Sequence, residues 1–260
     1  MSEVSDTLVA PAASNATSVR SDAPSVSDAP SVRSVAPPSD VAPKAAEPIT
    51  VSGIGRAWQA LVDTVGDELD HRQRLWVLEA GAGARTLFDM PEDAYVVGVD
   101  RDPWALERNI RLDERILAEL AHYRPLATGF DLLNCWYVLD RLEDPATMLD
   151  RFAQWTGEGG LVVLAVTNVR SPRGLLNRLV GPAKLRRHVT PTAVRRHLAG
   201  RGFTALLQVY FEDESQAEGR RRLRITRRRW SVLQVAVRVL SLGLLDAART
   251  DYIGVFRRDR

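Results

Sequence analysis

Cysteine and lysine are scarce in this sequence. Cys135 is the only cysteine among the 260 residues, so the chain cannot form an internal disulfide. A reducing, cytoplasmic setting is therefore the simplest expectation. Of the 35 basic residues only Lys44 and Lys184 are lysines, and the others are arginines. Because the forked guanidinium group suits phosphate and carboxylate, clusters of arginine are the places to look for anionic partners.

Long apolar runs are also missing. No stretch reaches the roughly 18 uncharged residues that a membrane span needs, and the N-terminus lacks the basic flank and apolar core of a secretory signal. Residues 1–50 are rich in serine, alanine and proline, contain SDAPSV twice and show no apolar periodicity, so we expect a disordered tail there. The remaining residues, 51–260, suffice for one globular domain with a full core.

Short apolar runs alternate with helical patterns along this domain. The predicted strands are 75–79, 94–100, 115–120, 130–136, 161–168, 204–211 and 251–258. Helices are expected at 56–69, after Gly83, after the caps Asp102 and Asp144, and at 190–203. This alternation predicts an α/β fold with a doubly wound, mostly parallel, seven-stranded sheet. Ligands of such sheets bind at the carboxyl ends of the strands.

A glycine turn follows the first predicted strand, in the stretch RLWVLEAGAGARTLF, residues 74–88. Glu79 ends the strand, and Gly81 and Gly83 allow backbone to approach a ligand closely. Twenty-one residues after Glu79, Asp100 ends the second predicted strand. A carboxylate there can accept both hydroxyl groups of a ribose. Together these residues predict a site for a cofactor that contains adenosine.

Two cofactor classes use this arrangement, and the charge of Glu79 separates them. Dinucleotides place a pyrophosphate on a helix N-terminus after a third glycine, but Thr86 stands at that position, and Glu79 would repel the pyrophosphate. A nucleotide-dependent oxidoreductase is weakened further because no lysine between residues 45 and 183 could complete a Tyr-x-x-x-Lys pair. S-adenosylmethionine suits Glu79 better, because its sulfonium and α-amino groups are cationic and it has no phosphate.

Four blocks of the sequence resemble, in order and spacing, the class I S-adenosylmethionine-dependent methyltransferases. They are VLEAGAGART (77–86), VVGVDRDPWALERN (96–109), FDLLNCWYVLDRLEDP (130–145) and GGLVVLAVTNVRSPRGLLNR (159–178). The blocks are most similar to the small-molecule group that includes the quinone-biosynthesis methyltransferases. The resemblance implies the Rossmann-like methyltransferase fold, S-adenosylmethionine as cofactor and a small-molecule acceptor. No metal site is predicted.

The resemblance also implies which residues bind the cofactor. They are Glu79, Ala80, Gly81 and Gly83 in the acidic-glycine loop, Asp100 at the ribose, Arg101, Glu119 and Leu120 at the adenine, and Trp136 beside the sulfonium. For Glu119, an ordinary surface position remains an open alternative. For Trp136, the open alternative is a place in the core.

The reaction narrows the search for a catalytic base. Methyl transfer from a sulfonium is a direct displacement, in which the enzyme mainly aligns the reacting atoms and excludes water. A general base helps when the nucleophile is a hydroxyl or an activated carbon. Asp140 and Arg141 stand where similar sequences often have glutamate and histidine, so that histidine is absent here. His188 and Tyr137 remain as candidate bases.

The motif at the end of the fourth predicted strand narrows the acceptor class. This motif, NCWY at residues 134–137, contains no proline, whereas N-methyltransferases of nucleic acids typically have an Asn/Asp-Pro-Pro-aromatic loop there. We therefore expect methylation of an oxygen or carbon atom of a small molecule, with a lipophilic molecule as the narrower option.

An unusual segment precedes the last predicted strand. Residues 220–229 contain seven arginines, and residues 231–248 are almost wholly apolar. We expect an insert over about 216–248 at the mouth of the substrate site, acting as a lid or, through 220–248, as a peripheral contact with anionic lipid at the membrane surface. A solvated arginine-rich loop beside a packed helix is the plainer alternative.

Two further functional hypotheses concern this insert. The alternative to an enzyme is a non-catalytic, methyltransferase-like module that docks on a membrane or a partner through the insert. Arginine runs attract the phosphates of RNA, but aromatic side chains for base stacking are scarce beside the insert. Nucleic acid is therefore not favoured as a partner.

Overall fold

The computed structural model describes residues 45–51, 54–168, 171, 189–211 and 251–260. All of these belong to the compact unit that spans Ala42–Arg260. The candidate base His188, the arginine-rich insert and most of the predicted N-terminal tail lie outside the described residues.

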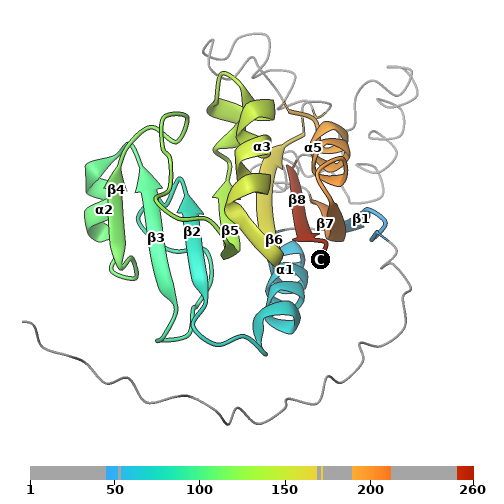
Figure 1. The fold of residues 1–260 in the computed structure, drawn as a ribbon. Helices are drawn as coiled ribbons and strands as arrows, with labels where there is room; N and C mark the ends of the chain where they lie inside the picture. Colours follow the sequence, from blue (N-terminus) through green and yellow to red (C-terminus); the bar gives the residue numbers. More distant parts are fainter. Residues whose placement is uncertain (1–44, 52–53, 169–170, 172–188, 212–250) are drawn as a thin grey trace, which may run out of the picture. The chain divides into compact units, whose positions relative to one another are not determined.

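A single eight-stranded sheet organises the described residues (Figure 1). Its strands are β1 (Ile49–Val51), β2 (Trp76–Ala80), β3 (Tyr95–Asp100), β4 (Glu114–Leu117), β5 (Phe130–Trp136), β6 (Thr156–Thr167), β7 (Phe203–Phe211) and β8 (Asp251–Arg258). Their order across the sheet is β1-β7-β8-β6-β5-β2-β3-β4. All neighbours are parallel except that β8 runs antiparallel to β6 and to β7. The predicted α/β class is confirmed, and β1 is a strand beyond the seven expected.

Helices cover both faces of the sheet. The helix α1 (Ile54–Leu69) packs its buried stripe against one face, and α3 (Pro145–Trp155) and α5 (Pro191–Ala199) pack against the other. Within β5, Leu132 belongs to the α1 side and Leu133 to the α3 side, because successive strand residues point to opposite faces. None of the described helices is long and apolar enough to cross a membrane.

Three helices begin at a side-chain cap followed by proline. Asp102 caps α2 (Pro103–Arg108), Asp144 caps α3 and Thr190 caps α5, and each accepts a backbone N–H of the first turn. Proline suits the first helical position because its missing N–H would have no partner there. The two aspartate caps confirm the sequence expectation.

The helix predicted after Gly83 is wrong. Residues 81–94 connect β2 to β3 without any helix. Pro91 leaves few residues in which a helix could form, because the residue before a proline disfavours helical backbone. The N–H of Leu87 instead donates to the Glu79 carboxylate at 3.3 Å. This bond brings Leu87 back beside the end of β2.

Candidate functional site

The carboxyl ends of β2, β3, β4 and β5 meet at one edge of the sheet, because these strands are parallel neighbours. A cavity of about 420 Å³ lies there, a size typical of small-molecule sites. Five of the predicted cofactor residues line it: Gly81, Asp100, Arg101, Glu119 and Leu120. The fold therefore gathers side chains from three separate connections around one hollow. Within the described ranges, no cluster of histidine, cysteine and acidic side chains could hold a metal ion.

The glycine turn after β2 lies close against its neighbours. The N–H groups of Gly81 and Ala82 both donate to the carbonyl oxygen of Val99, at 2.8 and 3.1 Å. Gly81 has a φ of +87°, and a Cβ there would lie 2.3 Å from Cγ2 of Val138. Gly83 has a φ of +56°, but a Cβ there would meet nothing within 4 Å. Glycine is thus needed at the first position for space and conformation, and at the second for conformation alone.

Asp100 ends β3 with its carboxylate at the cavity wall. Its Oδ2 accepts the N–H of Gly83 at 2.9 Å, and its Oδ1 accepts the N–H of Asp102 at 3.0 Å. A carboxylate oxygen can accept more than one hydrogen bond, so both oxygens can also receive hydroxyl groups of a ligand. The next residue, Arg101, is exposed and lines the same cavity.

Behind the turn, Glu79 of β2 and Asn134 of β5 form a buried polar pair. These residues are 5% and 1% exposed, and Asn134 Nδ2 donates to Glu79 Oε1 at 2.9 Å. Removal from water raises the pKa of Glu79 to about 7. Asn134 Oδ1 has no hydrogen-bond partner among the described residues. The pair therefore carries hydrogen-bond acceptors behind the turn, but neither residue is among those that line the cavity. The same holds for Ala80, which is part of the core.

The segment after β4 forms another part of the cavity wall. The strand ends at Leu117, so Glu119 and Leu120 lie beyond it rather than within the predicted strand. The reason is a turn in which the carbonyl oxygen of Glu119 accepts the N–H of His122 at 2.8 Å. Leu120 is buried, whereas the Glu119 side chain is 57% exposed and lies 3.6 Å from Nδ1 of His122. His122 also lines the cavity.

The first turns of α3 complete the cavity wall, which the sequence analysis did not anticipate. Asp144, Thr147, Met148 and Arg151 line it, and their spacing places them on one face of the helix. The Arg151 guanidinium also donates to the carbonyl oxygen of Ala121, which joins α3 to the segment after β4. The helical spacing, combined with the start of α3 at the carboxyl edge of the sheet, is the sequence signal that could have found them.

The turn η1 (Leu139–Arg141) carries Asp140 and Arg141. Asp140 is 5% exposed, and its Oδ2 accepts the N–H of Thr167, the last residue of β6, at 2.8 Å. Burial raises the pKa of Asp140 to about 6. Arg141 lines the cavity. The aspartate therefore ties η1 to β6, and the arginine brings a permanent positive charge to the cavity.

An aromatic cluster lies at the end of β5 on the α1 side of the sheet. The ring of Trp58 stacks on Phe88 at 5.8 Å and lies edge-on to Trp136 at 6.0 Å, and Trp136 lies edge-on to Tyr137 at 5.7 Å. Tyr137 has a φ of +56°, which is uncommon for a residue other than glycine. Neither Trp136 nor Tyr137 is among the residues that line the cavity. The structure thus places the predicted sulfonium neighbour and the candidate base together.

Comparisons with known proteins agree with one another. Residues 52–208, more than half of the chain, match the model of a family described as a methyltransferase domain. The ubiquinone biosynthesis O-methyltransferase of Aeromonas salmonicida is 26% identical over 123 residues, which cover 44% of this chain and 51% of that enzyme. The chain thus matches about half the length of this curated relative.

Two solved structures share the fold. An S-adenosylmethionine-dependent methyltransferase from Mesorhizobium loti superposes with a TM-score of 0.50 at 18% identity, covering 78% of this chain and 96% of that one. The N-methyltransferase NodS from Bradyrhizobium japonicum gives 0.51 at 16% identity, covering 79% and 96%. At these identities the similarity shows the fold alone, and it agrees with the fold that the sequence resemblance implies.

Proposed function

The chain belongs to the methyltransferase domain family, and on that premise we propose that it transfers a methyl group from S-adenosylmethionine to an oxygen or carbon atom of a small, lipophilic molecule. The observation that carries this proposal is the buried pair of Glu79 and Asn134 behind the glycine turn. A carboxyl group and an unpartnered amide oxygen offer acceptors to a cationic, donor-bearing ligand. The α-amino group of S-adenosylmethionine is such a group.

The residues that line the cavity in front of this pair fit the same cofactor. Each Asp100 carboxylate oxygen can accept a ribose hydroxyl in addition to the N–H group that it already accepts. Gly81 lines the cavity without a side chain, which leaves room for a ligand beside the backbone. Arg101 and Leu120 provide surfaces for the adenine at the cavity wall. A dinucleotide fits poorly, because no helix N-terminus follows the turn to hold a pyrophosphate.

The contribution of the protein to the reaction is positioning. S-adenosylmethionine supplies a methyl group bonded to a positively charged sulfur, which is open to direct displacement by a nucleophile. The residues around the turn would fix the adenosine end, and the Glu79–Asn134 pair would orient the amino end. Alignment of this kind can supply much of the rate enhancement of a two-substrate reaction. Tyr137 is the described candidate for holding a proton of the acceptor, and His188 is the candidate outside the described residues.

Two observations support an apolar acceptor that reacts at oxygen. The curated relative is by name an O-methyltransferase of ubiquinone biosynthesis. The half-buried rings of Trp58, Trp136 and Tyr137 provide an apolar surface where β5 ends. Membrane contact through residues 220–248 remains a separate proposal that concerns only undescribed residues. The alternative of a non-catalytic module draws no support from the comparisons.

The proposal is tested by ligand binding to the full chain and to Asp100→Ala. A ligand at ~100 times its dissociation constant stabilises a fold by roughly 2.7 kcal/mol, a shift of a few degrees. We expect such a shift with S-adenosylmethionine and S-adenosylhomocysteine but not with NADH. Loss of two hydrogen bonds to a charged carboxylate should weaken binding at least about 100-fold in Asp100→Ala.

Asp150→Ala is the matched control, because this acid pairs with Arg201 at 2.8 Å and does not line the cavity. It should bind S-adenosylhomocysteine as the unchanged chain does. A shift with NADH alone would overturn the proposal. With binding established, production of S-adenosylhomocysteine from S-adenosylmethionine in the presence of phenols, carbon acids or amines identifies the accepting atom, and methylation of amines alone would refute the oxygen or carbon assignment.

A further inference from the structure

The glycine turn is anchored from outside its own segment. With no helix after Gly83, the carbonyl groups of the turn have no helical partners and need other donors. Asn109, which is 1% exposed, supplies them: its Nδ2 lies 3.3 Å from the carbonyl oxygen of Ala82 and 3.4 Å from that of Gly83. Asn109 directly follows α2 as its C-cap. A side chain distant in sequence therefore holds the turn.

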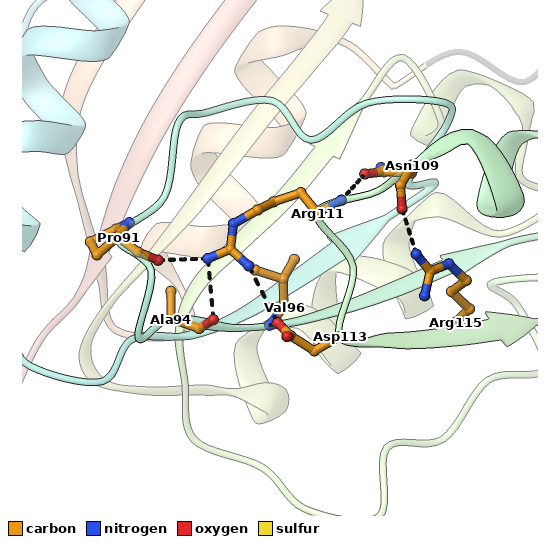
Figure 2. Close-up of polar contacts among 7 residues, drawn as sticks. All are labelled: Pro91, Ala94, Val96, Asn109, Arg111, Asp113 and Arg115. Carbon is orange, nitrogen blue, oxygen red and sulfur yellow. Dashed lines mark hydrogen bonds and ion pairs between the residues drawn. The ribbon is translucent and has the colours of Figure 1, made fainter.

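Asn109 is itself fixed by further hydrogen bonds (Figure 2). Its own N–H reaches back to carbonyl oxygens of the last turn of α2. Its Oδ1 accepts the N–H of Arg111 at 3.3 Å, and its carbonyl oxygen accepts Nη2 of Arg115 at 2.9 Å. The amide therefore cannot rotate away from the turn without losing bonds at both ends.

Arg111 holds the other end of the same β2–β3 segment, as Figure 2 shows. Its Nη2 donates to the carbonyl oxygens of Pro91 and Ala94, at 2.6 and 3.3 Å. Its Nη1 lies 3.5 Å from the carboxylate of Asp113, which also accepts the N–H of Val96 at 2.8 Å. Both ends of the stretch between the two strands are thus held by a few neighbouring residues.

An apolar contact completes this attachment. A Cβ on Gly98 of β3 would lie 2.4 Å from Cδ1 of Leu112 and 3.0 Å from Cβ of Ala82. Leu112 and Ala82 therefore both sit directly over the glycine. Leu112 is 4% exposed and belongs to the core on the α1 side. The connection that follows α2 and the glycine turn therefore pack over the same residue of β3.

We propose that residues 109–115, named here the turn clamp, set the position of the glycine turn for the cofactor, with Asn109 as the central positioning residue. Gly83 connects the two, because its carbonyl bonds to Asn109 and its N–H bonds to Asp100. A shift of the turn therefore moves the carboxylate proposed for the ribose. This inference rests on the proposed cofactor, and it adds that the affinity for it is set from outside the cavity.

The test compares Asn109→Asp with the unchanged full chain. The aspartate retains an acceptor for Arg111 N–H but loses the donor to the turn and places negative charge beside two carbonyl oxygens. We expect S-adenosylhomocysteine to bind about tenfold more weakly by calorimetry, the effect of losing one or two hydrogen bonds. We also expect amides of residues 81–90 to exchange hydrogen faster in the free protein.

Arg257→Ala is the control for general destabilisation. It removes a partly buried ion pair with Glu68, at 3.1 Å, between β8 and α1. This variant should lose thermal stability but keep the affinity and the exchange rates of the turn. Arg111→Ala and Arg111→Lys extend the test: the alanine should loosen residues 81–94, and the lysine should restore part of the protection because it can still donate to the two carbonyl groups.

The outcomes separate this inference from the proposed function. If the unchanged chain does not bind S-adenosylhomocysteine, the proposed cofactor is wrong, and the exchange rates still decide whether the clamp holds the turn. If the chain binds it, but Asn109→Asp binds equally well with unchanged exchange at residues 81–90, the clamp proposal is overturned. Should Asn109→Asp not fold, the pair of Arg111 variants gives the same decision.

Discussion

Glu79 is a carboxyl group that the fold holds almost out of contact with water. The hydrogen bonds from Asn134 and Leu87 favour its charged form, but desolvation outweighs them and raises the pKa to about 7 from an ordinary value of 4.5. In the free protein near neutral pH the group is therefore partly protonated. A cationic ligand beside it would favour the charged form and release the proton.

This pKa shift predicts a pH-dependent stability. Because the folded state binds a proton more tightly than the unfolded chain, the contribution of Glu79 is fully present below pH 4.5 and is lost as the pH rises to about 7. The free energy of unfolding should fall by up to about 3 kcal/mol over that range. Glu79→Gln should lose this part of the slope and be more stable than the unchanged chain at pH 8.

Urea denaturation at several pH values measures the effect. Asp140, whose pKa is raised to about 6, adds a slope of the same sign in both proteins, so the difference between the two proteins isolates Glu79. Equal slopes in the unchanged chain and in Glu79→Gln would contradict the prediction. The variant should also lose affinity for S-adenosylmethionine, although its fold is more stable.

The two glycines of the turn predict unequal costs of substitution. Gly81→Ala places a methyl group 2.3 Å from Val138 at a φ of +87°, and it should lower the free energy of unfolding by more than about 2 kcal/mol. Gly83→Ala meets nothing within 4 Å and should cost about 1 kcal/mol, from backbone conformation alone. Chemical denaturation of both variants tests this order, and equal losses would speak against the close approach of Val138.

At the scale of elements, the connection between β2 and β3 contains no helix and packs on α1 instead. The segment lacks the helix that would cover it, and its buried Phe88 packs on Trp58 of α1, with the two rings 16° from parallel. α1 thus covers sheet residues and the segment together. In place of a helix, the stacked rings of Phe88 and Trp58 supply the apolar packing of this connection.

Substitution of Trp58 tests this role of α1. Trp58→Ala should lower the free energy of unfolding by about 2 kcal/mol, since a half-buried ring and its aromatic contacts are lost. Trp104→Ala is the matched control, because that ring stands on α2 and is 69% exposed. Thermal denaturation should show a clear loss for the first and almost none for the second. Similar losses in both would mean that the stack contributes little.

The sequence predicted elements well where the signal was local. Apolar runs marked the long strands, and Asp102 and Asp144, each followed by proline, marked two helix starts. It failed where distant residues decide the conformation. A glycine turn usually opens a helix, but the bonds from Glu79 and Asn109 to residues 82–87 hold this chain in another path. Apart from Pro91, no pattern within that segment carries this information.

Some residues of the candidate site could likewise be predicted from local sequence, and others could not. Gly81 and Asp100 follow directly from strand ends, so spacing along the chain located them at the cavity. The cavity residues of α3 required its helical spacing to be combined with its start at the carboxyl edge of the sheet. His122 comes from the segment after β4, where no such regular spacing exists. Trp136 was predicted from its position at the end of β5, and its ring packs with Trp58 on the α1 side of the sheet. Spacing along the chain locates a residue at a strand end, but it does not show to which face of the sheet the side chain points.

At the scale of the whole molecule, the sheet extends to the residues before α1. β1 pairs with β7 from Ile49 to Val51, and the N–H of Ala46 donates to the carbonyl oxygen of Ala205 at 2.7 Å. Three residues with a single neighbour are too short to mark a strand in a sequence. The predicted domain start at residue 51 therefore falls inside this strand.

Truncation tests the importance of this edge strand. A chain that begins at residue 52 should unfold at a lower temperature than one that begins at residue 45, because it loses β1 and the bonds of Ala46. A few backbone hydrogen bonds at about 1 kcal/mol each predict a loss of about 2–3 kcal/mol, or several degrees. If the two chains melt together, β1 adds nothing to the stability of the sheet.

The position of β8 has a consequence for synthesis of the protein. β8 lies between β6 and β7 and pairs with both, so it alone joins the pair β1-β7 to the rest of the sheet. While a ribosome is still translating residues 212–250, β6 and β7 have already been made and their common partner has not. The nascent chain then carries two unpaired apolar edges, the kind of surface on which chains aggregate and chaperones act. Insertion of residues 251–258 between β6 and β7 closes both edges together.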